Sequence, residues 1–125
     1  MRALRLVGGL LLLCASTGAP AAPGSGPAAT SSVAARECRE AGDFIRNAAL
    51  SRDAGVSRTA FVQRLEDDLA AVRSFPPALR WFVHNAEDEA FLAREVAAVF
   101  DRPAGGEQHR VAFLERCFAR LPGTG

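Results

Sequence analysis

The sequence predicts an all-α fold: a compact bundle of four helices, or five if the third divides, closed by one disulfide. From residue 32 onward, apolar residues recur every three or four positions, which is the helical repeat. No segment shows the strict alternation of apolar and polar residues that is typical of a strand. Two cysteines, Cys38 and Cys117, lie near the two ends of this helical region.

Residues 1–21 have the pattern of a signal peptide. Arg2 and Arg5 give a positively charged start, and residues 6–15 form an apolar run of about ten residues. Small residues follow, and the motif Ala19-Pro20-Ala21 predicts cleavage after Ala21. The mature protein is therefore expected to be periplasmic or secreted.

Two alternatives for this leader remain open. An uncleaved membrane anchor would need about twenty apolar residues, whereas this run is shorter and contains Gly8-Gly9. Lipidation of Cys14 would need a small residue just before the cysteine, and this chain has Leu13 there. We expect no membrane span after cleavage.

Residues 22–31 contain only Ala, Pro, Gly, Ser and Thr. They are expected to form a disordered linker, because they can bury too little apolar surface to offset the entropy of ordering. The helical domain is expected over residues 32–121, and residues 122–125 should fray.

Residues 32–75 predict two amphipathic helices. The first starts near Ser32 and ends before Gly55, a residue that suits a left-handed C-cap. The second starts after the N-cap Ser57 and ends at Pro76-Pro77. Their apolar stripes are Ala34, Cys38, Ala41, Ile45 and Ala48 in the first, and Phe61, Leu65, Leu69 and Val72 in the second.

The third helical segment runs from Pro77 to Asp101, either unbroken or with a break near Asn85 that caps a new helix. Its main stripe is Leu79, Phe82, Val83, Ala86, Ala90, Ala93, Ala97 and Phe100, widened by Phe91, Leu92, Val96 and Val99. The last helix runs from about Glu107 to Arg120. Its inward residues are expected to be Val111, Leu114, Phe118 and Leu121, with Phe113 and Cys117 beside them.

Cys38 and Cys117 are expected to form a disulfide, because they are the two cysteines left in an oxidising compartment once Cys14 is removed. Two separate buried thiols are the alternative. The bridge would place the first and last helices side by side, where they could run antiparallel. A small domain would gain on the order of 4–5 kcal/mol at most from closing so long a loop.

Charge and motifs argue against several functions. The formal net charge of +1 falls to −1 without Arg2 and Arg5, which leaves no electrostatic footprint for nucleic acid. The chain has no phosphate loop, no Gly-x-Ser-x-Gly elbow and no Cys-x-x-Cys motif. We expect no cofactor.

His84, Glu87 and Asp88 form a weak polar cluster, because helical spacing could place them on one face. That spacing can place two ligands on one face, whereas a metal normally takes three or four, and no other cluster of His or Cys residues supplies the rest. The alternative is that the two carboxylates simply favour a helix start, with a histidine on the surface.

Arg80, Trp81 and Phe82 are candidates for a partner contact, because arginine and tryptophan often anchor interfaces. The alternative is that the two aromatic side chains fill the core or cover it.

Several short motifs between Ala35 and Cys117 can be compared with known groups. They are Cys38, Ala41-Gly42, Arg52-Asp53-Ala54-Gly55, Glu95-Val96, Val99-Phe100, Pro103 and Cys117. In these residues the chain resembles small exported proteobacterial proteins with a two-cysteine helical frame. In architecture alone it also resembles periplasmic acid-stress chaperones of the HdeA type, which implies apolar surface that grows on acidification.

We expect a non-enzymatic function: binding of a protein partner, or of a chaperone client, through apolar helix faces. One alternative is a carrier of a hydrophobic small molecule, which an enclosed apolar cavity would favour. Another is an enzyme or enzyme inhibitor that uses His84, Glu87 and Asp88, which a cleft joining His84 to a carboxylate would favour. An exposed apolar patch would favour the partner surface.

Overall fold

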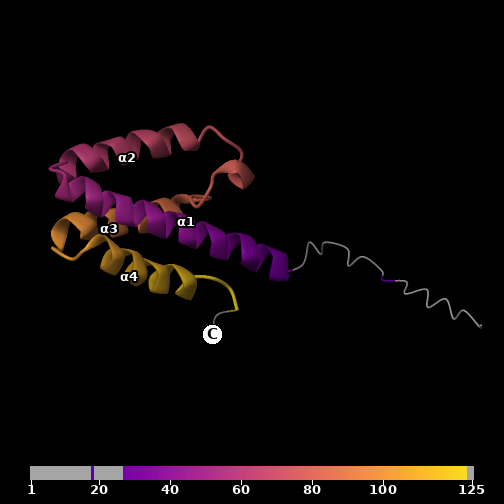
Figure 1. The fold of residues 1–125 in the computed structure, drawn as a ribbon. Helices are drawn as coiled ribbons and strands as arrows, with labels where there is room; N and C mark the ends of the chain where they lie inside the picture. Colours follow the sequence, from indigo (N-terminus) through magenta and orange to yellow (C-terminus); the bar gives the residue numbers. More distant parts are fainter. Residues whose placement is uncertain (1–17, 19–26, 124–125) are drawn as a thin grey trace, which may run out of the picture.

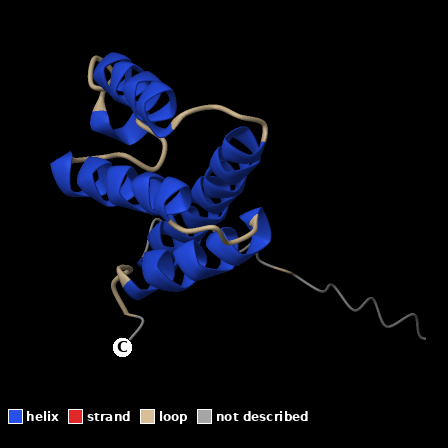
Figure 2. Ribbon diagram, turned by 90° about the vertical axis from the view of Figure 1, so that its left-hand side faces the viewer, coloured by secondary structure: helices blue, strands red, loops and turns tan. Residues whose placement is uncertain are grey.

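A computed structural model describes Gly18 and residues 27–123 of the chain. This part contains four α-helices: α1 (Pro27–Asp53), α2 (Arg58–Val72), α3 (Ala86–Asp101) and α4 (Gly106–Ala119). A short 3-10 helix, η1 (Pro77–Leu79), precedes α3. The described residues form helices and loops without a strand (Figure 2), which confirms the all-α prediction. Apart from Gly18, the predicted signal peptide lies outside the described residues.

The first and last helices form the most extensive helix pair of the bundle. Figure 1 shows α1 and α4 side by side and running in opposite directions, and α1 packs most extensively against α4. Helix α3 packs against both α1 and α2. The sulfur atoms of Cys38 and Cys117 are 2.04 Å apart, so the predicted disulfide joins α1 to α4 and is confirmed.

The end of α1 and the start of α2 are capped by the residues that the sequence predicted. Gly55 has a φ of 99° and closes α1 in the left-handed conformation that glycine adopts freely. The Ser57 hydroxyl accepts a hydrogen bond from the backbone N–H of Ala60 (3.1 Å) and caps α2. The start of α1 differs, at Pro27 rather than near Ser32, because proline suits a first turn and the alanines after it have the highest helix propensity.

The third segment divides at the predicted break. The Asn85 side chain accepts a hydrogen bond from the backbone N–H of Asp88 (2.9 Å), which makes Asn85 the N-cap of α3. The predicted continuous stripe was wrong, since Leu79 is 70% exposed. Residues 80–85 are not helical, so the two sides of the break do not share one helical period. The buried residues of α3 are Phe91, Leu92, Val96 and Val99.

Helix α4 buries the ridge of Phe113 and Cys117, which was predicted to lie beside the main one, more deeply than the predicted main ridge. His109, Phe113 and Cys117 are buried at spacings of four residues, while Val111 is 46% exposed. The disulfide explains the choice, because Cys117 must face Cys38 and residues one and two turns earlier share its face. The other predicted inward residues, Leu114, Phe118 and Leu121, are partly buried.

Candidate functional site

Residues 73–85, which join α2 to α3 and include η1, carry most of the predicted site residues. We call this segment the strap. The Arg80 side chain folds it by donating hydrogen bonds to the backbone carbonyls of Phe75 (2.6 Å) and Arg73 (2.9 Å). Arg80 was predicted as a partner contact, but its guanidinium is engaged with the strap's own backbone.

The strap exposes three large apolar side chains within a short length of chain. Leu79 is 70% exposed, Phe75 is 53% exposed and Trp81 is 36% exposed. The other exposed large apolar side chains of the described residues are spread over α1, the turn after it and α4: Val33, Leu50, Val56 and Val111. The strap is therefore where such side chains gather in this part of the chain.

Trp81 is held in an unusual conformation. Its φ is 35°, in the left-handed region, which costs a bulky residue about 1–3 kcal/mol. Its indole N–H donates a hydrogen bond to the Glu40 carboxylate (2.9 Å), and its ring meets the Phe44 ring edge-on at 6.2 Å. These contacts with α1 hold the strained residue in place.

Phe82 is more deeply placed than its neighbour Trp81, although the two rings are in contact, with centres 6.0 Å apart. It is buried and packs near Phe91 and Phe113, with ring centres 6.1 and 6.0 Å away. Of the predicted partner-contact residues, the structure therefore puts Trp81 at the surface and Phe82 in the core.

His84 makes three contacts that join different parts of the fold. Its Nε2 atom lies 2.9 Å from the Glu37 carboxylate of α1, and its Nδ1 atom lies 2.7 Å from the Pro77 carbonyl in the strap. Its backbone N–H donates to the Asp88 carboxylate of α3 (3.1 Å). The Arg120 guanidinium, just after α4, donates to the other oxygen of Asp88 (2.9 Å).

We call Glu37, His84, Asp88 and Arg120 the polar cluster. Sequence analysis found His84 and Asp88, which are close in the chain, but placed Glu87 with them; Glu87 is exposed in the first turn of α3 and does not line this site. It missed Glu37 and Arg120. One signal could have indicated both, since Glu37 adjoins Cys38 and Arg120 follows Cys117 by three residues, so the disulfide draws them together.

Burial alone would lower the pKa of His84. The hydrogen bonds to Glu37 and to the Pro77 carbonyl, together with the negative charges of Glu37 and Asp88, outweigh it and raise the pKa of His84 above its usual value. Both ring nitrogens are engaged with oxygen atoms, so the ring is not poised to take a proton from a substrate. The adjoining pocket of about 140 Å³ is smaller than a typical organic ligand site. The cluster is built to hold parts of the chain together.

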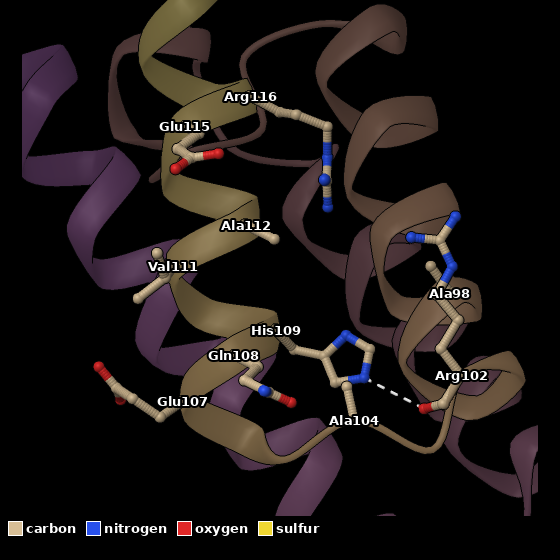
Figure 3. Close-up of a pocket in the computed structure, with 10 residues that line it drawn as sticks. All are labelled: Ala98, Arg102, Ala104, Glu107, Gln108, His109, Val111, Ala112, Glu115 and Arg116. Atoms are coloured by element: carbon tan, nitrogen blue, oxygen red, sulfur yellow. Dashed lines mark hydrogen bonds between the residues drawn. The ribbon is translucent and has the colours of Figure 1, made fainter.

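A larger pocket of about 550 Å³ lies between α3 and α4 (Figure 3). Small apolar side chains line it, with charged and polar ones around them: Ala98, Ala104, Val111 and Ala112, and Arg102, Glu107, Gln108, His109, Glu115 and Arg116. Figure 3 shows His109, Ala112 and Arg116 on the side of α4 that faces α3. The His109 Nε2 atom lies 3.2 Å from the Arg102 carbonyl and 3.5 Å from the Arg52 guanidinium.

Neither a metal-binding cluster nor a membrane-spanning helix occurs in the part of the chain that the structure describes. Within residues 27–123, no three His, Cys, Asp or Glu side chains gather closely enough to hold a metal ion. None of the helices in this part combines the length and the apolar character that crossing a bilayer requires. Comparison with known proteins found no matching family model, no similar curated protein and no similar solved structure.

Proposed function

We propose that this protein is an exported, non-enzymatic binding module that holds apolar segments of protein clients on its strap. The observation that carries the proposal is the gathering of Phe75, Leu79 and Trp81 at the surface of one short segment. Large exposed apolar side chains that lie close together, with polar residues around them, are typical of interaction sites. The disulfide supports export, because such bonds persist in oxidising compartments.

The surroundings of these side chains fit a protein client. Glu40, Arg73 and Glu89 place charged groups on and beside the strap, and Arg73 pairs with Glu89 through its Nε atom (2.9 Å). An apolar centre with a polar rim is the usual composition of a protein interface.

The strap is also ordered before any client binds. Arg80 donates hydrogen bonds to the strap's own backbone, and the side chains of Trp81 and His84 contact carboxylates of α1. Fixing the exposed side chains in advance lowers the entropy lost when a client binds them. The apolar side chains beneath the strap stay covered in this state, since Trp81 packs against Phe44 and Phe82. The strain at Trp81 fits this view, because such conformations persist where the surroundings impose them.

Replacing Phe75 and Leu79 together by serine is expected to weaken client binding. The two exposed side chains contribute apolar contact and little to the core, so about tenfold more protein should be needed for the same effect. The measurement is light scattering from a chemically denatured, cysteine-free test protein diluted into buffer with increasing amounts of the wild type or the variant.

The matched control replaces Val33 and Leu50 by serine, since they are exposed apolar residues outside the strap and outside the pocket between α3 and α4. This pair should suppress aggregation as well as the wild type does, and far-UV circular dichroism should show all three proteins folded alike. Equal loss in both double variants would overturn the assignment to the strap. A wild type that leaves aggregation unchanged would overturn the function itself.

The pocket between α3 and α4 favours a second candidate function, binding of a small amphipathic molecule. Its volume of about 550 Å³ lies in the range of organic ligand sites. The dye 8-anilinonaphthalene-1-sulfonate is a suitable probe, because it combines an apolar body with a charge. Ala112→Phe should fill the pocket and weaken dye binding about tenfold, whereas Ala70→Phe, on the exposed face of α2, should not. Equal dye binding by both variants would exclude this site.

A further inference from the structure

The contacts of the His84 ring indicate which protonation state the structure holds. The Pro77 carbonyl oxygen can only accept a hydrogen bond, and an ionised Glu37 carboxylate also can only accept. Both ring nitrogens lie within hydrogen-bond distance of these oxygens, at 2.7 and 2.9 Å. Only the imidazolium form donates from both nitrogens. A neutral ring would turn a lone pair toward one of the two oxygens and lose that bond.

The charged groups around the ring come from three helices. Glu37 projects from α1, Asp88 lies in the first turn of α3, and Arg120 follows α4. Arg120 is itself paired with Asp88, and its guanidinium lies over the Phe91 ring, 4.2 Å from the ring centre. The only other charged side chain of the strap between η1 and His84, Arg80, is bound to backbone carbonyls of the strap. The surroundings of His84 therefore favour a positive charge on the ring.

These two bonds close part of the strap into a loop and attach that loop to α1. The bond to Pro77 closes residues 77–84 into a loop that contains Leu79 and Trp81, and the bond to Glu37 fastens the loop to α1. Beneath this loop lie apolar side chains, since Trp81 packs against Phe44 and Phe82. Losing one of these two His84 bonds would loosen the loop and uncover part of this apolar surface.

We propose that protonated His84 is a latch that closes the strap onto α1 in acid and releases it as the pH rises, which widens the client-binding surface. The latch itself stands on the geometry of the ring. Its effect on clients rests on the proposed function. The direction is opposite to the acid-induced exposure that the architectural resemblance implies.

The direction in which pH changes the stability of the latch follows from the linkage between protonation and folding. A pKa of His84 raised by its partners means that the latch stabilises fully below the ordinary histidine value of about 6.5. This contribution is lost as the pH rises through the higher pKa of the folded protein. The chain has no lysine or tyrosine, and Cys38 is bridged to Cys117, so these residue types do not contribute to the step.

Trp81 provides a direct measurement, because it is the only tryptophan in the chain and lies in the strap. We expect quenching of its fluorescence by acrylamide to be low at about pH 5.5 and to rise about twofold by about pH 9, with one midpoint above 6.5. Nitrogen-15 NMR of the imidazoles should show both His84 nitrogens protonated at low pH and one unprotonated above the same midpoint.

Three variants separate the latch from other causes. His84→Gln should remove the pH-dependent step and also identifies the His84 signals. Glu37→Gln should move the midpoint down toward the ordinary histidine value, because the ring loses its paired charge. Glu40→Gln is the matched control, since Glu40 contacts Trp81 rather than His84, and it should leave the midpoint unchanged.

Quenching that is independent of pH in the wild type, or a step that persists in His84→Gln, would overturn the latch. So would greater access to Trp81 in acid. The link to clients is tested by repeating the aggregation assay at about pH 6 and about pH 8.5, where suppression should be stronger at the higher pH. If quenching changes and suppression does not, the latch stands and its effect on client binding is refuted.

Discussion

Replacing Cys38 and Cys117 together by alanine is expected to lower the free energy of unfolding by about 4 kcal/mol. The bond closes a loop with a sequence separation of 79 residues, so its removal releases a large entropy in the unfolded chain. Small domains are stable by only about 5–15 kcal/mol in total. The midpoint of urea unfolding, followed by far-UV circular dichroism, should therefore fall steeply.

The wild type treated with reductant provides the control for side-chain packing. Reduction breaks the bond and keeps both sulfur atoms, so the reduced wild type and the double alanine variant should unfold at similar urea concentrations. The variant should not respond to reductant. A loss below about 1 kcal/mol would show that the bundle does not depend on this bond, since native disulfides in small domains typically contribute 2–5 kcal/mol.

Local signals allowed most of the fold to be predicted. Gly55, Ser57 and Asn85 mark helix ends through their own backbone or side-chain chemistry, and each acts where the sequence placed it. The stripe of α1 was also correct, with Cys38, Ala41, Ile45 and Ala48 buried. These features depend on neighbours in the chain, so the sequence contains the information directly.

The errors arose where packing decided between two local solutions. Helix α4 has apolar residues over a wide arc, and the position of Cys117 against α1 selects the face that contains His109 and Phe113. In the third segment, the sequence left open an unbroken helix or a break near Asn85, and the Asn85 cap selects the break. Helical periodicity does not distinguish these choices, because both arrangements use the same 3.6-residue repeat.

In the candidate site too, contacts between residues close in the chain were predicted and contacts made by helix packing were not. His84 and Asp88 were found because four residues separate them, whereas Glu37 and Arg120 reach them only through the pairing of α1 with α4. Trp81 and Phe82 are adjacent in the chain, but one is exposed and the other buried. The positive φ of Trp81 produces that difference, and such a conformation in a residue other than glycine is too rare to predict from sequence.

Arg52 belongs to the motif Arg52-Asp53-Ala54-Gly55, but no role was predicted for it. In the structure its side chain connects two helix ends. From the last turn of α1 it donates hydrogen bonds to the carbonyls of Val99 (2.6 Å), Arg102 (2.8 Å) and Ala104 (2.8 Å). The final carbonyls of a helix lack intrahelical partners and carry the negative end of its dipole. Arg52 thus joins the end of α1 to the end of α3.

Arg52→Ala is expected to lower the free energy of unfolding by about 3 kcal/mol, because it leaves partly buried carbonyls without their charged donor. Arg52→Lys should recover only part of this loss, since an ammonium lacks the planar fork that reaches several carbonyls together. Urea unfolding measures both. Arg64→Ala is the matched control, because the Arg64 side chain is 80% exposed in its pair with Asp68, and its midpoint should match the wild type.

Arg52 and the disulfide fasten α1 at different places. Cys38 and Arg52 are separated by about 20 Å along the helix axis. The disulfide joins Cys38 to Cys117 of α4, whereas Arg52 binds mainly the end of α3 and touches α4 only at His109. Changes so far apart without shared partners usually add. The triple variant should therefore lose about 7 kcal/mol, which exceeds the stability of many small domains. A triple variant no less stable than the double alanine variant would show that Arg52 does not hold α3 in place.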